Sequence, residues 1–209
     1  TDKSVRRPVV GIMGEIFMRD NAGANGNIAN RLEELGAEVL VGPTAEWISY
    51  STARFTRDSR WKNDRKGIIK SKIQGIGQEI IEASLLRGIR KFTDQEKDIH
   101  LDEILSLSNR YINQFYDGDP PICIGGSIAL AKRGVSGIAA ILPFTCMPGT
   151  LIASVSDNLR KDHDNLPFIN IAYDGQDSVS LDTKLQAFVF QVMEYSKRFS
   201  PSGKVLQPS

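Results

Sequence analysis

Residues 7–43 constrain the fold of this chain more than any other stretch. "RPVVGIMGEI" (7–16) and "AEVLVGP" (37–43) are apolar runs rich in β-branched residues, as buried strands are. The segment between them repeats apolar residues at helical spacing, at Ile28, Leu32 and Leu35. A strand, a helix and a strand in this order predict a β-α-β unit, and therefore two parallel strands in one sheet.

The same alternation returns in the last part of the chain. "GIAAILPF" (137–144) and "LPFINIAYDG" (166–175) are typical of buried strands. They are separated and followed by helical patterns at 148–164 and 180–199. We therefore predict an α/β fold with a mostly parallel sheet and helices on both faces. In such sheets, ligands bind at the carboxyl ends of the strands.

The middle of the chain has a different character. From about 46 to 116 there is no strand signal, and apolar residues recur every three or four positions. We predict a single α/β domain over 1–209 with a helical insertion at about 46–116. Because the sequence lacks an initiating Met, we expect it to be a fragment of a larger chain.

Composition excludes several classes of partner. Lys and Arg number 26 against 25 Asp and Glu, so the charge favours neither nucleic acid nor an anionic membrane. No apolar stretch approaches the roughly 20 residues that span a bilayer, and the N-terminal residues lack the apolar core of a secretory signal. Two cysteines form no disulfide framework, so we expect a cytoplasmic protein.

Cys146 is the sharpest candidate for function. It lies in "PFTCMPGT" (143–150), after a predicted strand and close to the start of a helix, whose positive end stabilises a thiolate. Pro143 and Pro148 stiffen this turn. The alternative is a small buried hydrophobic residue, as most free cysteines are. That second interpretation is the one we favour for Cys123, in an apolar segment that could form a short strand.

Glu15 and Asn21 are the candidate catalytic residues. They belong to "GIMGEIFMRDNAGANGN" (11–27), a glycine-containing turn between the first strand and its helix, where they could face a ligand. The turn lacks both the dinucleotide fingerprint and the lysine of a P-loop, so we name no cofactor-binding residue. The alternative is that both side chains are simply solvated.

Three segments together carry a family resemblance. They are "VVGIMGEIFMRDNAGANGNIANRLEELGAEVL", "ILPFTCMPGT" and "LPFINIAYDGQ" followed by "TKLQAF". In these motifs, over about 110 residues at both ends, the chain resembles the 2-hydroxyacyl-CoA dehydratase components, especially the related C-terminal part of acyl-CoA dehydratase activase-related proteins (the CoA-substrate-specific enzyme activase family).

The resemblance implies a flavodoxin-like or Rossmann-like lobe, the last of two, in an anaerobic iron–sulfur protein. It implies that Cys146 is one metal ligand of a 4Fe-4S cluster completed by an upstream lobe of the same chain. An ATP-dependent activase would deliver the low-potential electron, and a CoA thioester (acyl-CoA) would receive it. The isolated domain would then be inactive, and its parent would be a dehydratase or reductase.

Two other functions stay open at this point. One is a non-catalytic docking module for the activase or for the rest of the chain, with the basic stretch 53–66 as its candidate surface. The other is a flavin- or nucleotide-binding protein, which the fold alone suggests.

Overall fold

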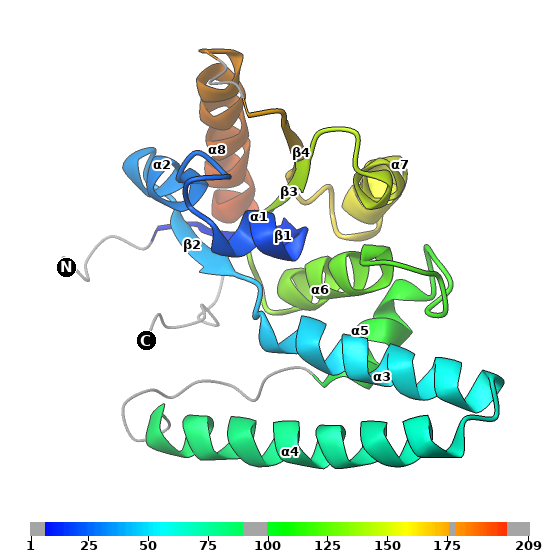
Figure 1. Cartoon of the computed structure of the whole chain (residues 1–209). Helices are drawn as coiled ribbons and strands as arrows, with labels where there is room; N and C mark the ends of the chain where they lie inside the picture. The colour runs from blue at the N-terminus through cyan, green and yellow to red at the C-terminus, as the bar shows by residue number, and fades with distance from the viewer. Residues whose placement is uncertain (1–6, 90–99, 176–178, 200–209) are drawn as a thin grey trace. The chain divides into compact units, whose positions relative to one another are not determined.

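A computed structural model describes residues 7–89, 100–175 and 179–199, and Figure 1 shows its architecture. Four parallel strands form one sheet in the order β2-β1-β3-β4. Their bounds are β1 Val9–Gly14, β2 Glu38–Val41, β3 Gly137–Pro143 and β4 Phe168–Tyr173. The predicted α/β fold with a parallel sheet is confirmed, and the strand order is that of flavodoxin-like folds.

Helices make up most of the remaining described chain. Their bounds are α1 Ile16–Asp20, α2 Ile28–Glu34, α3 Ala45–Trp61, α4 Arg65–Ile89, α5 Leu101–Ser108, α6 Pro120–Lys132, α7 Met147–Asp162 and α8 Val179–Phe199. Within the described ranges, no helix combines the length and the apolar character needed to cross a membrane.

The two faces of the sheet are covered by different helices, as predicted (Figure 1). On one face, α2 and α8 pack on alternate strand residues such as Val10, Ile12 and Ile141. On the other face, α6 and α7 lie against the central and edge strands, and Met13 and Ile138 pack there with residues of α6. Because helices cover both faces of the sheet, successive strand residues are buried on one side and then on the other. This explains why the strands are nearly continuous apolar runs in the sequence.

Helix α6 corrects one local prediction. We expected Cys123 on a short strand, but it lies in the first half of this helix, which begins at Pro120. Two prolines are tolerated there because the first turn of a helix has no intrahelical partner for its N–H groups. Close packing explains Gly125, since a Cβ there would lie 2.0 Å from the carbonyl oxygen of Ile104 in α5.

Contacts divide the chain into two compact units. The first contains the whole sheet and runs to Gly42 and again from Asp102. The second, Pro43–Leu101, is built on α3 and α4, which pack side by side. Helices therefore occupy most of the segment where a helical insertion was predicted.

Candidate functional site at the carboxyl edge of the sheet

The strand register brings three strand ends to one edge of the sheet. Gly14 at the end of β1 pairs with Ile141 of β3, and Pro143 at the end of β3 pairs with Tyr173 at the end of β4. The first residues after these strands are Glu15 and Phe144, and their N–H groups donate to Ile141 and Tyr173 carbonyl oxygens at 3.1 and 2.7 Å. Glu15 and the turn that contains Cys146 therefore lie at the edge at which α/β folds bind ligands.

Glu15 has a structural task at this edge. It is the N-cap of α1, and its carboxylate accepts a hydrogen bond of 2.9 Å from the Met18 N–H. Such a cap satisfies a donor that the first turn of a helix leaves unpaired, and it places negative charge at the positive end of the helix. Catalysis by Glu15 stays a prediction.

Asn21 ends the same short helix. Its side chain is exposed, and its Oδ1 accepts a hydrogen bond from the Ala24 N–H at 3.0 Å. The neighbouring Asn25 is the buried amide of this loop, donating to the Met18 carbonyl at 2.7 Å and accepting from the Ile28 N–H at 3.2 Å. The amide that fixes the loop is therefore Asn25, while the contribution of Asn21 to a ligand site remains untested.

Cys146 lies at the first turn of α7. It is the N-cap of that helix with extended backbone, and its side chain is half-buried. The preceding residue, Thr145, has φ +61°, a left-handed conformation that a β-branched residue rarely adopts. Strain of this kind is maintained only where the surroundings enforce it, and it gathers at functional sites.

Exposed apolar side chains lie on both sides of Cys146 in this turn, and another lies on α1. Phe144 and Met147 are 62% and 55% exposed, and Phe17 on α1, which follows β1 at the same edge, is 59% exposed. Exposed large apolar side chains are candidates for contact with another surface when they form one contiguous patch. We call Phe17, Phe144 and Met147 the edge cluster.

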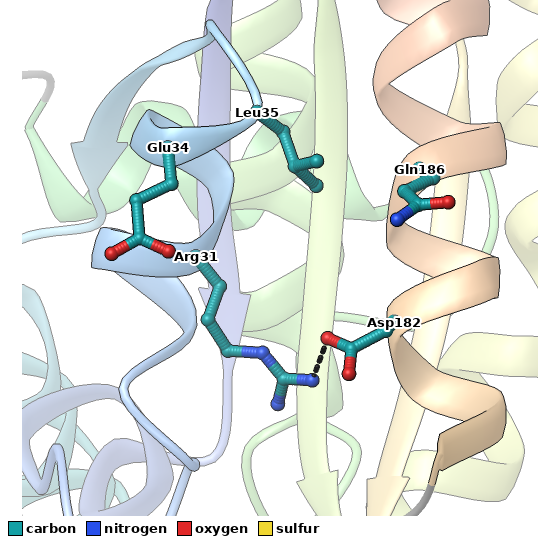
Figure 2. A pocket seen from close by; sticks show the side chains of 5 residues that line it. All are labelled: Arg31, Glu34, Leu35, Asp182 and Gln186. Atoms are coloured by element: carbon teal, nitrogen blue, oxygen red, sulfur yellow. Dashed lines mark hydrogen bonds and ion pairs between the residues drawn. The ribbon is translucent and has the colours of Figure 1, made fainter.

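A small cavity of about 270 Å³ lies between α2 and α8 (Figure 2). Arg31 and Asp182 form an ion pair across it, and Glu34, Leu35 and Gln186 complete its lining. None of the residues predicted to form the site lines it. The arginine that lines the cavity is therefore already paired with a carboxylate.

Tyr173, at the end of β4, is the unusual polar group near this cavity. Its hydroxyl oxygen is buried and has no hydrogen-bond partner in the described ranges. Burial raises the pKa of Tyr173 to about 12, while the positive charge of Arg31 opposes that rise. Nothing in the sequence distinguishes this tyrosine from a packed one, because the feature depends on its neighbours.

The described residues form no complete metal site. Among residues 7–89, 100–175 and 179–199, no three His, Cys, Asp or Glu side chains come close enough to hold a metal. Cys123 is buried, and its Sγ lies 3.2 Å from the Gly14 carbonyl oxygen that it contacts as donor. A 4Fe-4S cluster needs four cysteine thiolates, so this chain alone cannot hold one.

No protein-family model, no curated protein and no solved structure matches the chain. The resemblance to dehydratase components therefore remains a hypothesis, and the geometry of the carboxyl edge has to support any assignment of function.

Proposed function

We propose that the α/β unit docks on another lobe through its carboxyl edge and presents the Cys146 thiolate there as one ligand of a 4Fe-4S cluster. The lobe would belong to a dehydratase-like iron–sulfur protein, which is the function that the sequence resemblance implies. The observation that carries the proposal is a half-buried thiol at the start of α7, on a strained turn flanked by exposed Phe144 and Met147.

The position of Cys146 suits a metal ligand for electrostatic reasons. The first turn of α7 directs unpaired N–H groups and the positive end of a 16-residue helix toward this region. The thiolate is the form of cysteine that binds metal. A thiol packed on all sides could not reach a cluster, whereas Cys146 retains part of its surface.

The composite nature of the site follows from the ligand count. One thiolate here requires three more from another lobe or another chain, and docking would bury the edge cluster while bringing them together. When bound, such a cluster supplies low-potential electron transfer to a CoA thioester. This chain would contribute the ligand, the apolar docking surface and exclusion of water around both.

The partners in this proposal are the upstream lobe, an ATP-dependent activase and an acyl-CoA substrate. The protein would work in an anaerobic cytoplasm, where the thiolate and the cluster are protected from oxidation. Nucleic acid and membrane are not partners in the proposed function.

The test compares metal content in matched variants. The protein is purified without oxygen in its native sequence context, as wild type, Cys146→Ser and Cys123→Ser, and iron and acid-labile sulfide are measured per chain. The proposal requires a clear loss in Cys146→Ser, with content near wild type in Cys123→Ser. Equal iron in wild type and Cys146→Ser, with both folded by circular dichroism, would contradict it.

A docking module without metal is the second candidate, and the edge cluster favours it. In that case Phe144→Asp would weaken association with the upstream lobe, whereas Cys146→Ser would change neither association nor iron. The paired outcomes separate the two functions, because the iron–sulfur proposal requires Cys146→Ser to lose iron.

A further inference from the structure

Helix α4 carries four isoleucines on a side that does not face the helix against which it packs. Toward α3 it presents small and polar residues, and both Gln74 and Gln78 donate to the Thr52 hydroxyl, at 3.3 and 2.9 Å. On another side, four isoleucines are 60, 66, 59 and 64% exposed, namely Ile69, Ile73, Ile76 and Ile80. We call these four residues the isoleucine stripe. A packed helix normally buries its apolar side, yet the described part of the chain leaves the stripe mostly exposed.

The spacing of the stripe is that of a coiled-coil seam. Its members follow one another at intervals of four, three and four residues, which is the a and d pattern of a heptad repeat. In this register Gln74 and Gln78, which donate to Thr52 of α3, occupy b and f positions, and the buried Ser71 occupies another f position. The same helix can therefore keep its contact with α3 and receive a second helix on the stripe.

The charged residues beside the stripe can pair with those of a second, antiparallel copy of the helix. Its midpoint lies between Ile73 and Ile76, so an antiparallel copy places Ile73 against Ile76 and Ile69 against Ile80. In that arrangement the g positions also meet, and they carry Lys72 on one copy and Glu79 on the other, both exposed. A two-fold axis repeats this pair, so each dimer contains it twice.

We propose that α4 forms an antiparallel, two-fold symmetric helix pair with α4 of a second copy of this chain. The isoleucine stripes form its seam, and Lys72 pairs with Glu79 across it.

The residues at the e positions beside the stripe do not hinder this pairing. In the antiparallel register, Lys70 of one copy lies opposite Gly77 of the other, which has no side chain. A Cβ built on Gly77 would meet no atom within 4 Å, so the helix surface there is open. The seam can close without a steric or electrostatic clash on this side.

The size of the seam sets the expected affinity of the dimer. Four isoleucines on one helix bury less than the roughly 1,200 Å² typical of stable complexes, so the dimer should be reversible, with a dissociation constant roughly in the micromolar range. The proposal concerns residues remote in sequence from Cys146 and does not depend on the iron–sulfur function.

The first experiment measures mass as a function of concentration. Sedimentation velocity of the 209-residue chain, from submicromolar to several hundred micromolar, should show a monomer–dimer equilibrium. Ile73→Asp should leave only monomer, and Lys62→Glu, an exposed charge reversal before α4, should behave as wild type. A chain that stays monomeric at every concentration, or one whose Ile73→Asp variant loses helicity without a change in mass, would overturn the proposal.

The second experiment tests register and orientation by charge exchange. Lys72→Glu creates two Glu–Glu pairs and Glu79→Lys two Lys–Lys pairs, so each variant alone should dimerise roughly tenfold or more weakly at low salt. Mixing the two variants restores both opposite-charge pairs, and the mixture should form heterodimers with near wild-type affinity. The double variant should regain the homodimer. Failure of both rescues would exclude the antiparallel seam, even if the chain dimerises in another way.

Discussion

Replacing Gly125 by alanine tests the close contact between α5 and α6. Alanine is normally a better helix residue than glycine, by about 1 kcal/mol, so the change would stabilise an exposed helix. At Gly125, however, the added Cβ would lie 2.0 Å from the Ile104 carbonyl oxygen and 2.8 Å from its carbonyl carbon. Backbone atoms cannot rotate away as a flexible side chain can, so α5 and α6 must separate.

The expected magnitude follows from two opposing terms. Forcing an extra methyl group into a packed contact costs about 1–3 kcal/mol, and a backbone obstacle places this site near the upper end. Subtracting about 1 kcal/mol of helix propensity leaves a net loss of about 2 kcal/mol. For a chain of this length, 1 kcal/mol corresponds to about 2–4 °C in the unfolding midpoint, so the midpoint should fall by about 4–8 °C.

The assay is thermal and urea unfolding followed by far-ultraviolet circular dichroism. Gly75→Ala on α4 is the matched control, because its added Cβ would meet no atom within 4 Å. That control should gain up to about 1 kcal/mol, and it can be followed by the fluorescence of Trp47 and Trp61, which both lie on α3. An unchanged or raised midpoint in Gly125→Ala would refute the close contact between α5 and α6.

Two further predictions concern buried polar groups. Tyr173→Phe should raise the free energy of unfolding by up to about 1 kcal/mol, because it removes a buried hydroxyl with no partner in the described ranges; clear destabilisation in urea unfolding would show that the hydroxyl has one. For His163, burial is the largest cause of a pKa below 6.5, so the unfolded chain binds the proton more readily than the folded one. Stability should therefore rise with pH through the window that ends near 6.5 and fall on acidification, and His163→Gln should flatten this part of the profile of unfolding midpoint against pH.

Much of the sheet could be predicted from the sequence, because its two central strands, β1 and β3, are buried on both faces. The β-branched runs that became β1 and β3 have few polar positions, and glycine or proline marks where each ends. Helix α6 was harder to predict from the sequence, because its first turn contains two prolines and its centre two glycines, which usually mark a loop. Its helical state is supported by tertiary packing against α5, which no local pattern reveals.

The candidate site was predictable in position and not in detail. Cys146 follows a strand and precedes a helix, and that order alone places it at the carboxyl edge. Its partial exposure and the strain at Thr145 depend on the turn geometry, which the sequence does not encode locally. The periodicity of α4 similarly predicts a helix, but which side meets α3 is decided by the neighbouring helix.

The strand order has a consequence for synthesis of the chain on the ribosome. Strand β1 lies between β2 and β3, yet residues 42–136 must be made after β2 before β3 exists. At equilibrium this long connection costs little free energy. Its length is about three doublings of a dozen-residue crossover, which adds about 2 kcal/mol of loop-closure entropy. The delay during synthesis is long, because translation at about 5–20 residues per second leaves one edge of β1 unpaired for roughly 5–20 s. A nascent apolar strand with an open edge is a template for aggregation, so this topology leaves β1 open to non-native pairing until β3 has been made.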